Sequence, residues 1–447
     1  MKKILLKNRL LLTLFVGLLL RLISIDQSLW LDEATTALAA KMPLADIFTK
    51  FLPGDFHPPL YYLLMKGWGS LFGLSEISLR TPSVIFGILT IYFIYLIAKK
   101  IFDTKTARIA SILAATSGLL IYYSQEARMY SLAAFLATLL FYLFLEKKWV
   151  LFSIFLPILA MTDYVSLLII PVFWLLGYKD WKKLALAHIP LFIILIAWLP
   201  TFLSQLSGGF SVQGSAWWNL LGTISLKNIA LIPVKFIFGR ISFNNKILYG
   251  AVSLASVLLY SFLLVVRRPL KVRPYKVVWA WLIIPILLGI LISIKIPILY
   301  YFRFLFCLPA FYILAAGGIT SLKGKTFWIF LSTAILINIA SSSLYLFNPK
   351  FQRENWRAVA EAVGADAIIY PSNSQEEALT YYQKGGQIIY FENFDSVGRD
   401  LAEVWLSRYV WQIFDSKDMA RIKIENLGYN KVQELNLNGV EFWKYIK

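Results

Sequence analysis

Carboxylates near the start of the chain are the groups best suited to chemistry. Residues 1–349 contain only eleven Asp or Glu, and six of them lie in one polar interval after the first apolar segment: Asp26, Asp32, Glu33, Asp46, Asp55 and Glu76. Carboxylates beside a lipid bilayer are costly unless they have partners or a function, so this cluster indicates a functional site. Asp32 and Glu33 are adjacent, and a carboxylate placed at a membrane surface can accept the proton of an acceptor hydroxyl as a general base.

The acidic pair lies in the sequence SLWLDEATT, a few residues beyond the first apolar segment. On a helix, neighbouring side chains diverge by about 100°, so one acid can face a cavity while the other points elsewhere. The alternative is that one acid caps a helix that begins near Ala34, since Asp is a common N-cap residue. For the pair together we favour the catalytic interpretation, with Asp32 and Glu33 as the catalytic candidates.

Asp55 and His57 form a second polar group, in the sequence DFHPPLYY. The two prolines that follow are typical of the entry to a helix, which we expect to begin near Leu60. They would hold His57 at the helix N-terminus, where backbone N–H groups favour an anion. We therefore expect His57 to donate to a phosphate or sugar oxygen, with Asp55 beside it.

Four further charged residues fall in connections on the same predicted side of the membrane: Glu126 and Arg128 in YYSQEARMY, Asp163 in MTDYV, and Arg303 in YYFRFLF. Glu126 and Arg128 either line a site or pair with each other. Arg303 either binds a phosphate through its planar guanidinium group or extends to lipid headgroups. These alternatives remain open from the residues alone.

The elements that position these residues are expected to be membrane-spanning helices. The chain of 447 residues is 59% hydrophobic, with a mean hydropathy of +0.66 and only 15% charged residues. Apolar stretches of about 20 residues, long enough to cross a bilayer, recur along it. We predict a mainly α, polytopic protein of about eleven spans, at residues 8–25, 80–98, 107–123, 129–146, 149–162, 164–178, 184–203, 247–266, 277–294, 303–320 and 326–347.

The distribution of charge predicts the orientation. The formal net charge is +19, but the Lys and Arg residues concentrate in alternate short connections such as 99–106 and 267–276. Cytoplasmic loops of membrane proteins carry this excess, so the charge argues for a cell-membrane protein with a cytoplasmic N-terminus and against nucleic acid as a partner. One Cys and two His give neither a disulfide framework nor a metal site built from those residues.

The composition changes near residue 349. Residues 350–447 hold 12 Lys and Arg against 14 Asp and Glu, in alternating helical and strand-like stretches. This pattern predicts a small extracytoplasmic α/β domain. We therefore expect two domains, a transmembrane domain over 1–348, whose first extracytoplasmic loop is 26–79, and the α/β domain over 349–447.

At these motifs the chain resembles the GT-C superfamily of membrane glycosyltransferases. It is similar to the group that includes bacterial protein O-mannosyltransferases and lipid A aminoarabinose transferases, classed together as glycosyltransferase family 39-like. The resemblance covers most of residues 1–350 and rests on LWLDEATTALA, DFHPPLYYLL, SEISLRTPSVIFG, YYSQEARMYSL and YYFRFLFCLPA, in the expected order.

The resemblance implies roles for individual residues. Asp32 is the implied catalytic base, with Glu33 beside it, and His57, Arg128 and Arg303 are implied to bind the donor phosphate. The remaining site-lining residues are Asp55, Glu126 and Asp163. The last of these is a departure, because many relatives have Thr-His-Tyr where this chain has Thr162-Asp163-Tyr164.

The implied reaction transfers a sugar from a polyprenyl-phosphate carrier, within membrane lipids, to an extracytoplasmic lipid, glycan or protein acceptor. No cofactor is obligatory, and a divalent cation at the first-loop acids remains an open alternative. The competing interpretations are a transporter or lipid-linked glycan flippase, a polysaccharide polymerase or ligase, and a non-catalytic scaffold. A transporter would be expected to have broken helices with polar residues near the middle of the membrane.

Overall fold

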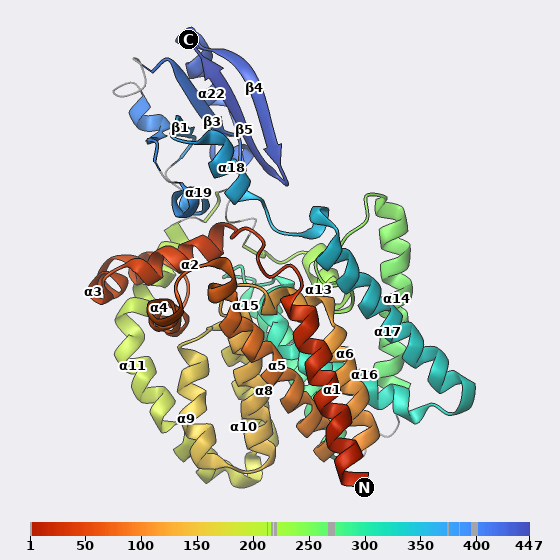
Figure 1. The fold of residues 1–447 in the computed structure, drawn as a ribbon. Coiled ribbons are helices and arrows are strands. Elements are labelled where there is room, and N and C mark those ends of the chain that lie inside the picture. The colour runs from red at the N-terminus through yellow and green to blue at the C-terminus, as the bar shows by residue number, and fades with distance from the viewer. Residues whose placement is uncertain are drawn as a thin grey trace. The chain divides into compact units, whose positions relative to one another are not determined.

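The computed structural model of the chain (Figure 1) describes residues 2–211, 213–215, 218, 221–266, 273–372, 375–383, 385–394 and 401–447. These residues form two compact units. The helical unit comprises residues 1–25, 43–64 and 80–351, and the α/β unit comprises residues 26–42, 65–79 and 352–447. The α/β unit thus contains two parts of the first loop as well as the C-terminal region.

Most of the long apolar helices among the described residues lie in the helical unit. Helices α4 and α5 begin or end in the α/β unit, and the others lie wholly in the helical unit. The bounds are α1 Lys2–Leu22, α3 Leu44–Asp46, α4 Leu60–Phe72, α5 Glu76–Ile101, α6 Thr104–Thr116, α7 Gly118–Ser124, α8 Tyr130–Leu145, α9 Trp149–Ala160, α10 Ile170–Leu176, α11 Trp181–Ser211, α13 Leu226–Phe238, α14 Lys246–Val266, α15 Arg273–Ile292, α16 Leu308–Ser321 and α17 Gly324–Phe347. Short helical turns join them: η1 Ile47–Phe51, η2 Leu52–Gly54, η3 Val165–Ile169, η4 Tyr178–Asp180, η5 Tyr301–Cys307 and η6 Pro349–Phe351.

Six of these helical segments are long and apolar enough to cross a membrane, or seven if α6 and α7, which meet at a bend of 58°, are one broken span. The expected count of about eleven is therefore not confirmed. Helices α8 and α9 fall on predicted spans but have 16 and 12 residues, fewer than the roughly 20 that a straight crossing needs. The broader prediction of a multi-pass membrane protein agrees with the structure.

Burial separates central from peripheral helices. The apolar window of the segment Tyr301–Ser321, which contains α16, is 89% buried, whereas the windows that contain α11 and α14 are 17% and 22% buried. Helix α16 packs against α6, α14 and α15. A long helix that exposes large apolar side chains along its length is expected in an apolar solvent, so α11 and α14 have the surfaces expected of lipid-facing helices.

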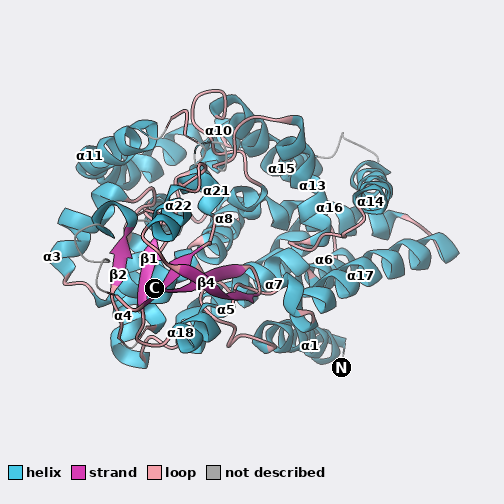
Figure 2. Cartoon of the chain, turned by 90° about the horizontal axis from the view of Figure 1, so that it is seen from above, coloured by secondary structure: helices cyan, strands magenta, loops and turns pink. Residues whose placement is uncertain are grey.

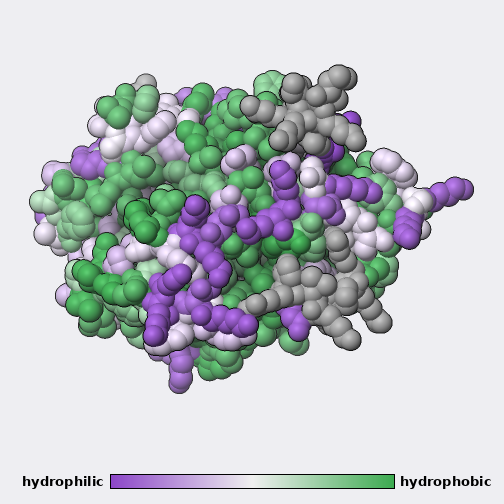
Figure 3. All heavy atoms as spheres, turned by 90° about the horizontal axis from the view of Figure 1, so that it is seen from below, coloured by the Kyte–Doolittle hydropathy of each residue, from purple (hydrophilic) through white to green (hydrophobic). Residues whose placement is uncertain are grey.

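Hydrophilic residues on the face shown in Figure 3 form a band across a mostly hydrophobic surface. Two ion pairs join neighbouring connections of the helical unit: Lys100 Nζ lies 2.7 Å from Glu146, and Lys147 Nζ lies 2.7 Å from Asp180. The connections 99–106, 146–148 and 178–183 therefore lie at one end of the helices, as the alternation of basic loops predicts. Of the predicted basic connection at 267–276, residues 267–272 lie outside the described residues, and residues 273–276 belong to α15. Which side of the membrane this end faces stays a prediction.

The α/β unit is built on one five-stranded sheet, and Figure 2 shows its strands in magenta. The strand order is β2-β1-β3-β5-β4; β1 is parallel to β2 and β3, and β5 is antiparallel to β3 and β4. Asn438 and Gly439, both with positive φ, form the two-residue turn of the β4–β5 hairpin. The bounds are α2 Leu31–Lys41, α18 Trp356–Val363, β1 Ala367–Tyr370, α19 Glu377–Tyr382, β2 Ile388–Tyr390, η7 Phe391–Asn393, β3 Glu403–Ser407, α21 Trp411–Phe414, α22 Met419–Asn426, β4 Asn430–Leu437 and β5 Val440–Ile446.

Alternate residues of the strands bury opposite faces of the sheet. On β1, Ile368 belongs to a cluster with residues of α18 and α19, while Ile369 belongs to a second cluster with residues of α22. Ala34 of α2 is part of the first cluster. A helix from the first loop therefore contributes to the core of this unit, and the predicted helices and strands of the C-terminal region are present in order.

Candidate active site

Asp55 and His57 lie together in the helical unit. His57 Nδ1 is 3.3 Å from Asp55 Oδ1, and the side chains are 22% and 15% exposed. As the two prolines predict, α4 begins at Leu60, whose backbone N–H donates to Met161 O at 2.9 Å. Gln205 Nε2 donates to the backbone oxygen of His57 at 3.0 Å. The segment is thus fixed by contacts from the residue that follows α9 and from α11.

Arg128 and Tyr62 complete this group. Arg128 Nη2 lies 3.3 Å from His57 Nδ1, Arg128 Nη1 donates to Tyr62 Oη at 3.1 Å, and Tyr62 Oη donates to Asp55 Oδ2 at 2.6 Å. Burial alone would raise the pKa of Asp55, but the neighbouring His57 and Arg128 and the hydrogen bond from Tyr62 hold it well below its usual range. Asp55 therefore remains ionised and anchors a buried cation, since Arg128 is 3% exposed.

Asp163 and Arg303 extend the group. Asp163 is buried, and its Oδ2 accepts the backbone N–H of Ser166 at 2.9 Å. Burial raises the pKa of Asp163, while His57 and Arg303 are close enough to oppose that rise. Arg303, on η5, donates to Pro297 O at 3.4 Å. The structure therefore brings together five of the predicted residues: Asp55, His57, Arg128, Asp163 and Arg303.

Glu126, which is also a predicted site residue, lies near Arg240, a cation that the sequence analysis did not single out. It is buried on the loop between α7 and α8 and lies in the electrostatic range of Arg240. Arg240 Nη1 donates to Tyr122 Oη at 2.6 Å, and its guanidinium carbon lies 4.8 Å from the centre of the Tyr122 ring. The only Arg within residues 204–246, in the sequence FGRIS, was the available signal.

Gly239 explains how Arg240 reaches this position. Its φ is +65°, and a Cβ there would lie 3.0 Å from both Gly118 C and Leu119 N. Only glycine allows this conformation and approach at low cost. The end of α13 thus packs directly against the start of α7 and delivers Arg240 to the tyrosines.

Glu33 lies in the α/β unit and has a structural partner. Helix α2 begins at Leu31, so Asp32 and Glu33 occupy its first turn and neither is the N-cap residue. Glu33 Oε2 lies 3.1 Å from Arg353 Nε, with the two side chains 0% and 1% exposed. The same oxygen accepts the Trp30 backbone N–H at 3.4 Å. The capping role that the sequence left open therefore applies to Glu33, because its side chain in the first turn accepts the backbone N–H of the N-cap residue Trp30.

Asp32 has different surroundings, as the divergence of neighbouring helical side chains predicts. It is partly exposed, and it acts electrostatically on Glu377 and Tyr409. Helix α2 packs against α19. Asp32 and Glu33 thus belong to the α/β unit, whereas the other predicted site residues belong to the helical unit.

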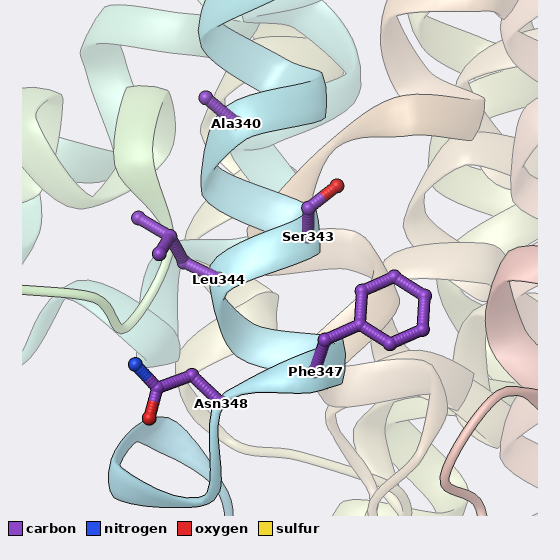
Figure 4. Close-up of a pocket in the computed structure, with 5 residues that line it drawn as sticks. All are labelled: Ala340, Ser343, Leu344, Phe347 and Asn348. Carbon is purple, nitrogen blue, oxygen red and sulfur yellow. The ribbon is translucent and has the colours of Figure 1, made fainter.

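Two further observations concern ligands. A depression of about 480 Å³ is lined by residues of the last turns of α17 and the residue that follows it: Ala340, Ser343, Leu344, Phe347 and Asn348. Figure 4 shows that their side chains project to different sides of the helix. It contains no predicted site residue and no convergent polar groups, so it is not a candidate substrate site. Among the described residues, no three His, Cys, Asp or Glu side chains are grouped so as to hold a metal ion. The suggestion of a divalent cation at the first-loop acids stays a prediction.

Comparison with known proteins supports the fold. Residues 56–204 match the family model described as dolichyl-phosphate-mannose-protein mannosyltransferase. No curated protein sequence matches the chain. The chain is similar to ArnT from Cupriavidus metallidurans bound to undecaprenyl phosphate, with 12% identity, 97% of each chain covered and a TM-score of 0.62. The apo state of that ArnT gives 12% identity, 98% of each chain covered and a TM-score of 0.63.

A second similar structure is the oligosaccharyltransferase AglB from Archaeoglobus fulgidus in complex with an inhibitory peptide and a dolichol-phosphate. It is 14% identical, with 99% of this chain and 74% of that chain covered and a TM-score of 0.55. At these identities the similarity concerns the fold, and it extends over nearly all of the chain. The resemblance drawn from the sequence agrees with both comparisons, because the chain shares its fold with ArnT and AglB and residues 56–204 match the mannosyltransferase family model.

Proposed function

We propose that the protein transfers a sugar from a polyprenyl-phosphate-linked donor to an extracytoplasmic acceptor, with Asp32 as the general base. The observation that carries the proposal is the group formed by the buried Arg128 and the partly buried His57 and Asp55 in the helical unit. Its support is the shared fold with two proteins whose structures contain undecaprenyl phosphate and dolichol-phosphate. The acceptor is a lipid, a cell-surface glycan or a protein.

The cations are assigned to the donor. Arg128 presents a planar guanidinium group that suits two phosphate oxygens, and Asp55 fixes it through Tyr62. We assign Arg303 and Arg240 as further cations that bind the same phosphate, the single phosphate group of the polyprenyl-phosphate donor. Holding the phosphate by fixed cations stabilises the charge that develops on it as the sugar leaves.

The proton transfer is assigned to the α/β unit. The acceptor hydroxyl gives its proton to the Asp32 carboxylate while its oxygen bonds to the anomeric carbon of the sugar. The bond between that carbon and the phosphate oxygen breaks, and the polyprenyl phosphate leaves with the electron pair. We assign Glu33 to positioning, because its ion pair with Arg353 holds the first turn of the helix that carries Asp32.

The test is a transfer assay with the purified protein in lipid nanodiscs. Radiolabelled undecaprenyl-phosphate sugars are supplied as donors, and membranes of a deletion strain provide the acceptor. Loss of a general base typically costs about 10²–10⁴ in rate, so Asp32→Asn should lose turnover by that factor while it still binds donor. Asp46→Asn is the matched control, because this first-loop acid is partly exposed and makes only an i,i+4 pair with Lys50.

Arg128→Gln tests the other half of the proposal. It should mainly raise KM for the donor, because it removes a phosphate-binding charge and leaves Asp32 in place. Unchanged turnover in Asp32→Asn would refute the assignment of the base. Unchanged donor binding in Arg128→Gln would refute the assignment of the phosphate site.

The bend between α6 and α7 favours a second candidate, a lipid-linked glycan flippase, because broken helices are typical of transporters. This candidate predicts movement of a labelled polyprenyl-phosphate sugar across vesicle membranes without any new glycosidic bond. Measuring both products in the same vesicles separates the two functions.

A further inference from the structure

A group of carboxylates and tyrosines surrounds the start of α19 in the α/β unit. Glu376 and Glu377 are adjacent there, and Asp32 of α2 acts electrostatically on Glu377. Tyr390 Oη donates to Glu376 Oε1 at 2.7 Å. The other members of the group are Glu354, Tyr370 and Tyr409. We call these seven residues the acidic tyrosine site.

Glu376 and Glu377 differ from other acids of the unit. Among the described residues, neither has a Lys, Arg or His within ion-pair distance, and the Oε2 atom of each is buried with no hydrogen-bond partner. By contrast, Glu33 pairs with Arg353 and Asp366 pairs with Lys444. A buried carboxylate oxygen without a donor is unfavourable, so these two atoms lack a partner that a bound molecule can supply.

Tyr370 provides an independent indication. The residue is 2% exposed, and within the described part of the chain its hydroxyl makes no hydrogen bond of normal geometry. The ring is fixed at the end of β1, with its centre 6.2 Å from that of Phe442. Glu376, Glu377 and Tyr390 are its electrostatic neighbours, and the Ser407 side chain lies beside it. A buried hydroxyl that lacks a hydrogen bond of normal geometry among the described residues therefore lies within electrostatic range of the same carboxylates.

Burial and charge both act on this site. Burial raises the pKa of Glu377, and the negative charges of Glu376 and Asp32 raise it further. Burial and the charge of Glu354, whose Oε1 accepts Tyr409 Oη at 2.8 Å, raise the pKa of Tyr409 well above its usual range. Burial and like charges thus oppose ionisation of Glu377, and a bound cation would favour its ionised form.

The geometry distinguishes a metal ion from an organic cation. A divalent metal needs several oxygen ligands close together, and no three acidic or histidine side chains among the described residues form such a set. An ammonium group has three donors that can reach separate acceptors, and tyrosine rings also attract it. We propose that the acidic tyrosine site binds a primary ammonium group on the acceptor. This rests on the proposed function, because the helix that carries Asp32 packs against α19.

The first experiment measures binding by calorimetry with the full chain in nanodiscs. The probe is glucosamine, and the matched uncharged probes are glucose and N-acetylglucosamine. We expect glucosamine to bind and the neutral sugars not to bind. Glu377→Gln should weaken binding by about 10–100-fold, the usual range for a hydrogen bond to a charged group. Glu361→Gln is the control, because Glu361 is exposed on α18 of the same unit and should leave the affinity unchanged.

A second variant guards against loss of folding. Tyr370→Phe removes only the hydroxyl without a partner, so it should weaken glucosamine binding several-fold while thermal stability stays equal or rises. Equal affinity for glucosamine and glucose, or binding of Mg²⁺ that depends on Glu377 in place of the amine, would overturn the proposal.

Transfer is measured separately, so the two proposals can fail independently. In the transfer assay, acetylation of amines on the acceptor membranes should reduce the product, and the reduction should be smaller in Glu377→Gln. Amine binding without any transfer would refute the proposed function but support this cation site. Transfer that is insensitive to acetylation would refute the cation site as an acceptor subsite and leave the proposed function intact.

Discussion

Replacing Glu33 by Gln removes one charge from a fully buried ion pair. Arg353 then stays buried with a neutral amide in place of its carboxylate partner, and the bond from Trp30 N–H loses its charged acceptor. Because Asp32 and Glu33 are neighbours in the first turn of α2, sequence alone assigns both to catalysis. The structure predicts that Glu33→Gln acts mainly on stability, whereas Asp32→Asn acts mainly on turnover.

The magnitude follows from the geometry. At 3.1 Å and an effective dielectric constant of about 20, two unit charges attract by about 5 kcal/mol. Breaking a buried pair by removing one partner costs about 3–5 kcal/mol, since the remaining charge is left uncompensated. A loss of 1 kcal/mol in the free energy of unfolding lowers Tm by about 4 °C, so the Tm of the α/β unit should fall by about 12–20 °C.

The assay is thermal unfolding in nanodiscs, followed by intrinsic tryptophan fluorescence, beside the transfer assay at a temperature well below either transition. Glu392→Gln is the control, because Glu392 is exposed in the same unit. A double variant, Glu33→Gln with Arg353→Gln, should be more stable than the sum of the single losses predicts. Near wild-type stability together with lost turnover in Glu33→Gln would refute this reasoning and assign the base to Glu33.

Three further outcomes are expected. In a Cys307→Ser background, a cysteine at exposed Glu361 should react with an impermeant reagent from outside intact cells, and labelling only from the cytoplasmic side would contradict the topology. The pKa of Asp55 is lowered by folding, so its stabilising effect is complete above the unfolded value of about 4 and is lost as pH falls through the lower folded value. Asp55→Asn should thus lower Tm equally from pH 8 to 9, above the range in which imidazoles usually titrate, and a deficit that varies across this range would be inconsistent. Gly239→Ala should lower the free energy of unfolding by about 1–3 kcal/mol, because Gly239 has a positive φ and lies close to the α7 backbone. Gly250→Ala is the control and should leave stability unchanged, because there is open space around Gly250. Equal melting temperatures of the two variants would refute this prediction.

The sequence predicted the local features well. The Pro58-Pro59 pair placed the start of α4 at Leu60, and alternating apolar residues placed the strands of the C-terminal region. Each of these depends on neighbours within a few residues, where propensity and periodicity act directly. The grouping of Asp55 with His57 belongs to the same class, since only one residue separates them.

The count of spans was harder to predict, for a physical reason. Hydropathy measures how apolar a segment is, and α9 is apolar throughout, but the structure gives it only 12 residues. A short helix inside a bundle and a complete crossing have similar composition. The two differ in the length of the folded helix, which is set by breaks such as the one before η3. That length is known only from the structure.

The contacts between residues far apart in the chain could not be predicted from the sequence. Arg240 and Tyr122 are 118 positions apart, and their contact depends on the close approach of α13 to α7 at Gly239. Arg353 likewise follows Glu33 by more than three hundred positions. Nothing in the spacing of either pair indicates contact, so only the fold can distinguish a buried partner from a solvated charge.

These long-range contacts explain why the C-terminal region matters for a reaction assigned to the first loop. Helix α2 is short, and isolated helices of about a dozen residues are marginal in water. In this protein α2 is held by the Glu33–Arg353 pair, by Ala34 in the core beside Trp356, and by packing against α19. Each of these contacts comes from beyond residue 351. The position of Asp32 therefore depends on residues beyond 351 that belong to the same α/β unit and that are assigned no catalytic role themselves, as is expected when supporting contacts must fix a general base on a short helix.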